Sequence, residues 1–318
     1  MHVVHLLERT MPPPEPGDAG GMPVLVTWLA RAQRNAGDRV TVVSPSGRAT
    51  EAYEQRTPSR WTAEEIRAAL PSDTDVVHLH GEGATLPGID AACTDLPRVS
   101  TVHGNHEGRE LPLTNRVYVS ADHARRHGGR VFVYNGLPIA DYAVDVHQAR
   151  DGLIFLGKLR RSKKGAKAAL RIARTCGEHL YLAGRPTWKV PASRLPAWPG
   201  ITALGPVDGS DKLAALSRAR ALLFPIGWEE PFGLVLIEAM ACGTPVIASR
   251  RGAVPEIVAD GRTGMICDTE PEMVQATERL DRFDPEACQA HVREHFDIER
   301  TRREYSDLYR RAVSGERW

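Results

Sequence analysis

The segment Pro225–Pro245 reads PIGWEEPFGLVLIEAMACGTP and joins two glutamates to an apolar run. Glu230 and Glu238 stand eight residues apart, with the apolar run Leu234–Ile237 between them, and Gly243 suits the end of a helix that we predict over 233–241. A carboxylate in so apolar a helix costs free energy unless something hydrogen-bonds to it. The pair therefore indicates a ligand site. A solvated Glu238, and a Glu230 that simply favours the helix N-terminus, would be the ordinary alternative.

The spacing of the two carboxylates limits the chemistry that they can share. Eight residues at ~1.5 Å each separate them by roughly 12 Å along a helix, too far to flank one glycosidic bond as paired hydrolase carboxylates do. They suit the two ends of one elongated ligand. Pro231 fits the first helical turn. The backbone N–H groups of Phe232, Gly233 and Leu234 would then face anionic or hydroxyl oxygens of that ligand.

Outward from this segment, short apolar runs alternate with amphipathic stretches along the chain. This alternation predicts an α/β fold with parallel sheets covered by helices. The predicted strands are Val3–Leu7, Val40–Val43, Val76–Leu79, Val99–Val102, Val117–Val119, Val131–Val133, Leu153–Leu156, 179–183, 221–224 and 245–248. The predicted helices cover 24–32, 62–70, 165–175, 211–219 and 233–241.

A polar, irregular stretch at 139–151 separates two such series, and 318 residues suffice for two domains. We predict two Rossmann-like, doubly wound domains, 1–145 and 146–295, followed by an amphipathic helix at 296–318 that packs back toward the first domain. Ligands of such folds bind beyond the carboxyl ends of the strands. A cleft between the domains is therefore the expected site.

Charge excludes some partners and favours others. The 41 basic and 40 acidic residues nearly cancel, so no overall field attracts nucleic acid or anionic lipid. Residues 1–149 carry a net charge of −4 and residues 150–318 a net charge of +5, which favours an anionic ligand in the second half. Only six basic residues are lysines, and four of them, Lys158, Lys163, Lys164 and Lys167, fall within ten residues.

Cysteine usage and the N-terminus predict a cytoplasmic protein. The five cysteines are scattered and odd in number, which is typical of reduced thiols in the core. No signal-peptide pattern opens the sequence, and no run approaches ~18 apolar residues.

Two nucleotide-binding motifs are missing. The segment that starts at Gly81 comes nearest to GxGxxG, but Leu86 occupies the third glycine position, which disfavours a dinucleotide-dependent oxidoreductase. No GxxxxGK[ST] segment exists, which excludes P-loop chemistry.

Across nearly its whole length the chain resembles family 4 retaining glycosyltransferases of the GT-B fold, most specifically from about 153 to 268, and among them the compact bacterial enzymes of antibiotic biosynthesis. Beyond the Glu-x7-Glu segment, the matching stretches in the second half are Phe155–Leu159 with Lys164–Gly165, Leu182–Gly184, Leu204–Val207, Gly252–Val258 and Gly261-x-x-Gly264. Those in the first half are Gly20–Gly21, Thr101–Gly104, Val119–Ser120 and Tyr134–Gly136.

The resemblance implies a role for each matching residue. Lys158 and Lys164 would grip the diphosphate of a UDP- or GDP-sugar, with a lysine at 158 where the family usually has arginine, while Glu238 would hold the ribose. Glu230 and the amides of Phe232, Gly233 and Leu234 would hold the transferred sugar. The loop at Val207 would hold the base, and the Gly20–Gly21 amides would approach the diphosphate from the other domain. No cofactor and no metal are expected.

The histidines allow a second interpretation. His78 and His80 share one face of a predicted strand, and His103 and His106 follow another, with Glu82 and Glu107 close by; these could form a metal site. The family resemblance needs no metal and instead places His103 beside the transferred sugar. We expect His123 and His127, four residues apart, to lie on a solvated helix face.

The resemblance implies transfer with retention of anomeric configuration. A GT-B epimerase or phosphorylase and a non-catalytic nucleotide-sugar sensor remain alternatives. The net charge of −4 on the first half disfavours a membrane-bound acceptor and favours a small soluble one, and the sequence does not identify the base, the sugar or the oligomeric state.

Overall fold

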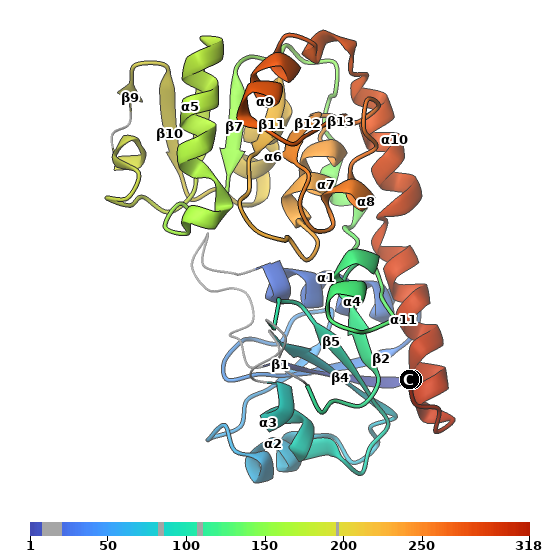
Figure 1. Ribbon diagram of the computed structural model, residues 1–318. Helices are drawn as coiled ribbons and strands as arrows, with labels where there is room; N and C mark the ends of the chain where they lie inside the picture. Colours follow the sequence, from blue (N-terminus) through green and yellow to red (C-terminus); the bar gives the residue numbers. More distant parts are fainter. Residues whose placement is uncertain (8–20, 82–85, 107–110, 195–196) are drawn as a thin grey trace. The chain divides into compact units, whose positions relative to one another are not determined.

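The computed structural model describes residues 1–7, 21–81, 86–106, 111–194 and 197–318. It forms two compact units, each with a parallel sheet between layers of helices (Figure 1). Unit 1 comprises Met1–Leu137 and Ile298–Trp318, and unit 2 comprises Pro138–Asp297. The expected doubly wound α/β architecture is confirmed for each unit.

The units divide the chain differently from the expected boundaries. Unit 2 starts at Pro138 rather than 146, because Tyr142 is buried there and its hydroxyl donates to Glu238 within the same unit. The final helix is part of unit 1, and the Ile298 N–H bonds the carbonyl of Leu137.

Unit 1 has a six-stranded sheet in the order β3-β2-β1-β4-β5-β6, in which all neighbours are parallel. Its strands are β1 (His2–Leu7), β2 (Arg39–Val43), β3 (Glu54–Arg56), β4 (Val76–Gly81), β5 (Arg98–Val102) and β6 (Arg116–Tyr118). Its helices are α1 (Gly21–Asn35), α2 (Ala63–Ala69), α3 (Leu86–Asp90), α4 (Ala121–Arg126) and α11 (Ile298–Val313).

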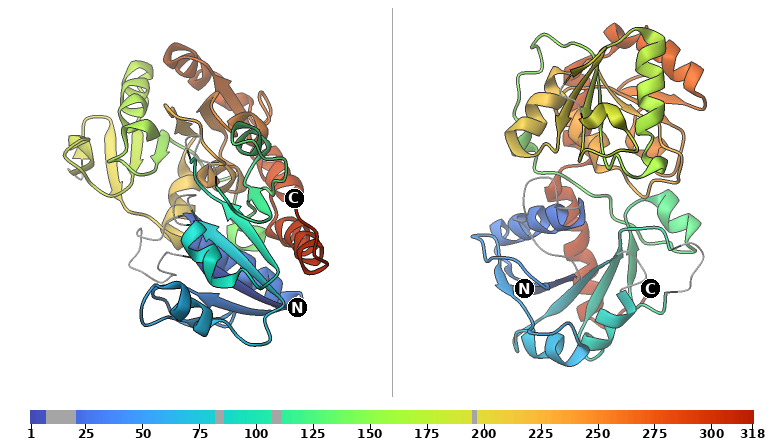
Figure 2. Two further views of the ribbon diagram at one scale, coloured as in Figure 1. Left: turned by 60° about the horizontal axis from the view of Figure 1, so that its bottom comes forward. Right: turned by 90° about the vertical axis from the view of Figure 1, so that its left-hand side faces the viewer.

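Alternate residues of these strands face different helical layers. Val4 and Leu6 of β1 pack in a cluster with Ile66 of α2. Val3 packs instead with α11 and with Leu29 of α1, because successive side chains of a strand point to opposite faces of the sheet. The helices therefore lie on both faces of the sheet, as Figure 2 shows from two further sides.

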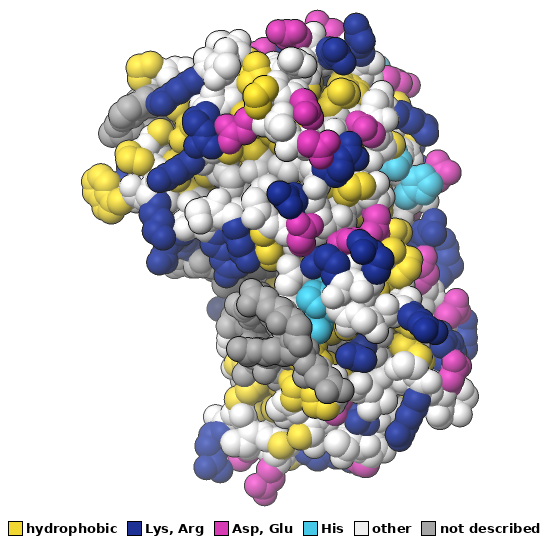
Figure 3. Space-filling model, in the orientation of Figure 1, with side chains coloured by type: hydrophobic (Ala, Val, Ile, Leu, Met, Phe, Trp, Pro, Cys, Tyr) yellow, Lys and Arg dark blue, Asp and Glu magenta, His cyan; other side chains and the backbone are white. Residues whose placement is uncertain are grey.

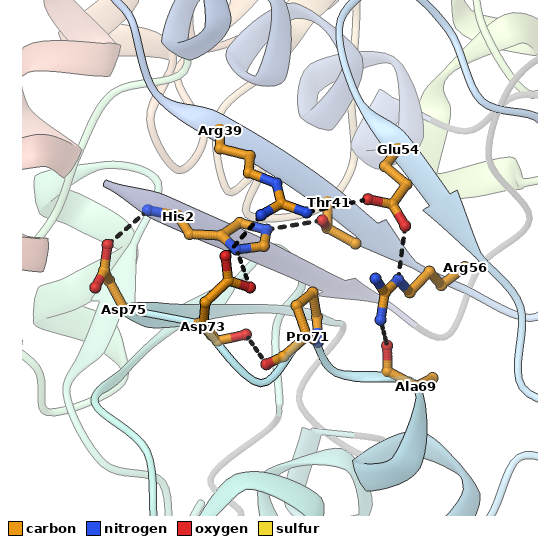
Figure 4. Close-up of polar contacts among 10 residues, drawn as sticks. His2, Arg39, Thr41, Glu54, Arg56, Ala69, Pro71, Asp73 and Asp75 are labelled. Carbon is orange, nitrogen blue, oxygen red and sulfur yellow. Dashed lines mark hydrogen bonds and ion pairs between the residues drawn. The ribbon is translucent and has the colours of Figure 1, made fainter.

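The amino-terminal ends of β1 and β2 are held by polar contacts (Figure 4). The His2 imidazole contacts Asp73 at 3.1 Å and Thr41 at 2.9 Å, and Arg39 donates to the same Asp73 at 2.6 Å. Asp75 accepts from the His2 backbone N–H at 2.7 Å. These bonds fix the end of the sheet opposite to the carboxyl ends of the strands.

Unit 2 has a seven-stranded sheet in the order β13-β12-β11-β7-β8-β10-β9, parallel except for the pair β10–β9. Its strands are β7 (Leu153–Leu156), β8 (Leu180–Ala183), β9 (Ala197–Trp198), β10 (Ile201–Gly205), β11 (Ala221–Phe224), β12 (Val246–Ser249) and β13 (Gly264–Cys267). Its helices are α5 (Ala166–Cys176), α6 (Gly209–Arg218), α7 (Leu234–Ala241), α8 (Val254–Ile257), α9 (Glu270–Thr277) and α10 (Pro285–His295).

Several predicted elements differ from the structure. Val131–Val133 forms only an isolated bridge, at Phe132, because the sheet of unit 1 ends at β6. Strands β3, β9, β10 and β13 were not predicted, since none of them is a plain apolar run. Helix α7 begins at Leu234, so Pro231 does not lie in its first turn. Gly233 caps it in the left-handed conformation, with φ +93°.

The charge difference between the sequence halves disappears in the folded units. Unit 1 contains 20 basic and 20 acidic residues, and unit 2 contains 21 and 20. Two changes cause this: residues 298–318, which include α11, add six arginines and four acidic residues to unit 1, and Asp141 and Asp145 belong to unit 2. Unit 1 therefore carries no net negative charge, and its charge does not disfavour a membrane-bound acceptor.

The cysteines are free thiols, and four of the five are buried. Burial raises the pKa of Cys93, Cys242 and Cys288 to about 12, which keeps these thiols protonated and unreactive.

Within the described ranges, no helix has the length and apolar character needed to span a membrane.

Candidate functional site

The two glutamates of the opening segment lie on different elements of unit 2. Glu230 belongs to the loop after β11 and Glu238 to the middle of α7, and each is only 7% exposed. Because Glu230 precedes the helix, the separation of roughly 12 Å along one helix axis does not apply. The solvated alternative for Glu238 is wrong as well.

Glu230 is held by a cation and an indole. Its Oε2 accepts from Lys164 Nζ at 2.7 Å and from Trp228 Nε1 at 2.9 Å. Lys163 Nζ lies 3.7 Å from the centre of the Trp228 ring, in the geometry of a cation–π contact. The tryptophan therefore links the two neighbouring lysines to the carboxylate.

The loop that carries Lys164 is docked on the loop that carries Glu230. The Gly227 N–H donates to the Lys163 carbonyl at 2.9 Å. Gly165 follows in the left-handed conformation, with φ +86°, and a Cβ there would lie 2.0 Å from the Pro225 carbonyl oxygen. Only glycine allows this approach, so the Lys-Gly pair fixes where the lysine side chain starts.

Glu238 has its own cation. Its Oε1 accepts from Lys212 Nζ of α6 at 2.6 Å and from the Tyr142 hydroxyl at 3.0 Å. Burial, together with the neighbouring Glu238, raises the pKa of Tyr142, so the phenol stays a hydrogen-bond donor. Val207 lies just before α6, which places the predicted base-binding loop on the element that supplies Lys212.

The two carboxylates share a pattern. In each, one oxygen takes two protein donors, whereas the other, Oε1 of Glu230 and Oε2 of Glu238, has no partner among the described residues. A carboxylate oxygen accepts only, so each open oxygen is suited to a hydroxyl group of a ligand.

The start of α7 lies between them in the sequence. The N–H groups of Gly233 and Leu234 make no hydrogen bond within the described part of the chain, while Phe232 is buried. Glu229 accepts from the Gly252 N–H at 2.6 Å, and a Cβ on Gly252 would lie 2.3 Å from the Glu230 carbonyl oxygen. The family-like Gly252 therefore shapes the backbone around Glu230.

Lys158 is exposed on the loop directly after β7. A cavity of about 390 Å³ lies nearby, between α5 and α9, and contains none of the predicted donor residues. Figure 3 shows basic side chains gathered in this part of unit 2. The basic residues that line the cavity are Arg160, Arg161, Lys167, Arg171 and Lys189. An ion pair between Arg171 and Glu270 spans its two helices.

In unit 1, His103 follows β5 and is half-buried. Its backbone N–H donates to the Gly81 carbonyl at 2.8 Å, and its ring Nε2 lies 3.0 Å from His80 Nδ1. Burial lowers the pKa of His103 to about 4, so the ring is neutral at physiological pH. Gly21 is the exposed first residue of α1, and Gly20, Glu82 and Glu107 lie outside the described residues.

The other histidines are less exposed than their spacing suggested. His78 and His80 do share one strand face, with ring centres 3.9 Å apart. The expectation of a solvated face at His123 and His127 was wrong, because the ring of His123 in α4 and the ring of His127 at its C-terminal end both pack toward Tyr118. Burial lowers the pKa of His123 to about 3 and that of His127 to about 4. His106 stacks beside His127, with 3.9 Å between ring centres.

Sequence reasoning missed three contact residues: Lys212, Tyr142 and Trp228. The first could have been found, since Lys212 is one of only two lysines outside the cluster in a chain that otherwise uses arginine. Nothing in the local pattern marks Tyr142, because its contact joins residues 96 positions apart.

Family models match both halves of the chain: "Glycosyltransferase Family 4" over residues 19–146 and "Glycosyl transferases group 1" over residues 150–281. A glycogen synthase of Mycobacterium tuberculosis is 30% identical, with 76% of this chain and 70% of the relative covered. A phosphatidyl-myo-inositol mannosyltransferase of the same species is 28% identical, with 82% of each covered.

Solved structures share the fold over nearly the whole length. AviGT4, a glycosyltransferase involved in avilamycin A biosynthesis, has a TM-score of 0.80 at 25% identity and 99% coverage of both chains. Anabaena HepE in complex with UDP and glucose has a TM-score of 0.74 at 18% identity, with 96% and 98% covered. Fold and site thus define a glycosyltransferase of the GT-B class. The chain belongs to glycosyltransferase family 4.

Proposed function

We propose that this glycosyltransferase moves a sugar from a UDP- or GDP-sugar to a hydroxyl of a small soluble acceptor, with retention of anomeric configuration and without a metal. The observation that carries the donor assignment is the pair of buried carboxylates in unit 2, each with one oxygen held by a lysine and the other open.

We propose a place along the donor for each group. Glu238, beside the base-binding loop at Val207, accepts from the ribose hydroxyls. Lys158 and Lys164 hold the diphosphate, and Glu230 with the N–H groups of Phe232, Gly233 and Leu234 holds hydroxyls of the sugar. For unit 1 we keep the prediction that His103 contacts the transferred sugar.

The chemistry follows from the charges. The bond between the anomeric carbon and the diphosphate oxygen breaks, and the acceptor oxygen forms the new bond on the same face. The acceptor proton passes to an oxygen of the departing diphosphate. Fixed ammonium groups and helix-start N–H groups stabilise the negative charge that develops there. Lys164 already points at Glu230, so the cation and the sugar-binding group act at adjacent positions.

The acceptor assignment rests on one similarity. The relatives named above differ in acceptor, since one is a glycogen synthase and another a phosphatidyl-myo-inositol mannosyltransferase. AviGT4 matches this chain end to end and is involved in making avilamycin A, which supports a small-molecule acceptor in bacterial secondary metabolism.

Nucleotide binding tests the donor site directly. We expect UDP or GDP to raise the melting temperature of the wild-type protein. In Glu238→Gln the dissociation constant of that nucleotide should rise at least tenfold, about 1.4 kcal/mol, because the ribose loses a charged acceptor. The control is Glu270→Gln, which removes an exposed carboxylate on the other helical face of unit 2. An unchanged dissociation constant in Glu238→Gln would contradict the ribose role.

A further inference from the structure

A chain of side-chain hydrogen bonds crosses unit 1 from α1 to His103. Gln33 Oε1 lies 2.7 Å from His5 Nε2, His5 Nδ1 lies 2.9 Å from His80 Nε2, and His80 Nδ1 lies 3.0 Å from His103 Nε2. Gln33, His5 and His80 are at most 2% exposed. They fill the layer between the sheet and the helices α1 and α11, where apolar side chains are the norm.

A second branch starts from the same glutamine. Gln33 Nε2 donates to the Tyr309 hydroxyl at 3.1 Å, and that hydroxyl lies 2.7 Å from His78 Nδ1. His78 Nε2 lies 2.7 Å from Thr101 Oγ1, which in turn lies 2.9 Å from the Tyr305 hydroxyl. Gln33 is therefore the junction of two polar chains in a buried layer.

The distances fit hydrogen bonds and not a metal centre. Two imidazoles on a tetrahedral zinc, with Zn–N of ~2.05 Å, place their ligating nitrogens roughly 3.4 Å apart. The His5 and His80 nitrogens are 2.9 Å apart, and both ring nitrogens of His5, His78 and His80 already have a protein partner. The cluster is thus satisfied by its own side chains.

The four imidazole rings of the two hydrogen-bond chains are neutral near pH 7. Burial lowers the pKa of His5 and of His103 to about 4 and holds the pKa of His78 and of His80 well below its usual value. A neutral imidazole carries one proton, so one ring nitrogen donates and the other accepts.

The glutamine fixes the direction of the whole chain. Its amide oxygen only accepts, so His5 carries its proton on Nε2 and accepts at Nδ1. His80 must then donate from Nε2 and accept at Nδ1. His103 in turn must donate from Nε2, which leaves its Nδ1 unprotonated. That atom has no hydrogen-bond partner among the described residues.

We propose that Gln33, acting through His5 and His80, is a positioning residue that fixes His103 in the Nε2-protonated form, so that its Nδ1 is an obligatory acceptor for a hydroxyl of the transferred sugar. This role rests on the proposed function of His103. It goes further because a residue of helix α1, outside the proposed sugar contact, then determines which nitrogen of His103 carries the proton.

The tautomer can be measured without any substrate. Nitrogen-15 NMR of histidine-labelled protein at pH 7.5, with the His103 signals assigned through a His103→Gln sample, distinguishes a protonated Nε2 from a protonated Nδ1. We expect a protonated Nε2 on His103 in the wild type. In Gln33→Leu a substantial fraction should carry the proton on Nδ1. A His103 protonated on Nδ1 in the wild type, or unchanged in Gln33→Leu, overturns the proposal.

Two further variants separate this role from simple packing. Gln55→Leu makes the same change in the same unit outside the chain, where Gln55 contacts Ser44, and should leave the tautomer unchanged. Gln33→Glu keeps an accepting oxygen and so should keep the proton on Nε2. Its added negative charge should raise the histidine pKa values and move the acidic limb of the pH–rate profile to higher pH. An unmoved limb in Gln33→Glu contradicts the coupling.

Kinetics then connects the tautomer to catalysis. Gln33→Leu should lower kcat/KM roughly tenfold, since a hydroxyl donor loses its acceptor in the altered fraction. Nucleoside diphosphate affinity should stay within twofold, because the side chains proposed to hold the nucleotide, Lys158, Lys164 and Glu238, all lie in unit 2. If His103 is fixed in the Nε2-protonated form but the protein transfers no sugar, the hydrogen-bond chain is supported and the proposed function is contradicted. If the protein transfers sugar but the tautomer of His103 is not fixed, the proposed function is supported and the role of Gln33 is contradicted.

Discussion

At the scale of single residues, the central feature is the pairing of Lys164 with Glu230. The side chain of Lys164 is 21% exposed and that of Glu230 is 9% exposed, so the pair is partly desolvated and its loss is more costly than that of a surface pair. A donor diphosphate would compete with Glu230 for this cation. The ammonium has three donors, so it can bridge the two groups.

The lysine cluster offers a matched comparison at this scale. Lys164→Ala should lower kcat/KM by an amount equivalent to roughly 2–4 kcal/mol, because a charge-assisted contact to the departing diphosphate is lost. The adjacent Lys163→Ala removes an exposed ammonium from the Trp228 face and should stay within about threefold of wild type. Steady-state kinetics with saturating acceptor measures both. Equal effects, or activity of Lys164→Ala within threefold, would contradict the assignment.

Sequence reasoning at this scale found residues with a local signal. Glu230, Glu238 and Lys164 stand in a motif, so their types and spacing identified them. Their orientation could not be predicted: the start of α7 depends on the positive φ of Gly233, and this moved Glu230 off the helix. Contacts between distant segments, such as Tyr142 with Glu238, had no sequence signal.

At the scale of elements, the loops after β7 and β11 form one construction. Three contacts hold these loops together: the ion pair of Lys164 with Glu230, the hydrogen bond from Gly227 N–H to the Lys163 carbonyl, and the close approach of Gly165 to Pro225. The apolar strands themselves were predictable, because buried parallel strands are continuous apolar runs. Short strands such as β3, with the sequence Glu-Gln-Arg, were not, since only their neighbours in the sheet make them strands.

The two glycines that flank α5, Gly165 and Gly177, test this arrangement of the loops. Gly165→Ala should destabilise unit 2 by more than ~3 kcal/mol and abolish tight nucleotide binding, because its Cβ would meet the Pro225 carbonyl and φ is positive. Gly177→Ala, at the other end of the helix, also has a positive φ but open space, so roughly 1 kcal/mol is expected. Denaturant unfolding with nucleotide titration measures both. Similar losses in the two variants would contradict the docking of the loops.

At the scale of the whole molecule, the polar histidines are concentrated in unit 1. Among the described residues, the histidines with a lowered pKa are His5, His78, His80, His103, His123 and His127 in unit 1 and His291 in unit 2. The two-unit organisation was predictable from the alternating elements. The charge balance of each unit was not, because α11 returns to unit 1 only in the folded chain.

Acid should therefore weaken unit 1 first. A histidine whose folded pKa is depressed to about 4 binds its proton more readily when unfolded, so its contribution is intact above pH 6.5 and is lost as the pH falls toward 4. Each such group can remove up to ~1.4 kcal/mol per pH unit in this window. Hydrogen exchange between pH 7.5 and pH 5, corrected for intrinsic rates, should show protection falling in unit 1 more than in unit 2. Parallel losses would contradict this expectation.

The central claim is a metal-independent glycosyl transfer with retention from a nucleotide sugar. Proton NMR of the anomeric signal, recorded during turnover of the best-bound UDP- or GDP-sugar with a small hydroxyl acceptor in excess EDTA, tests it most directly. The account predicts a product with the same anomeric configuration as the donor, formed at an undiminished rate. An inverted anomeric signal, or turnover that stops in EDTA and returns with a divalent cation, would contradict it.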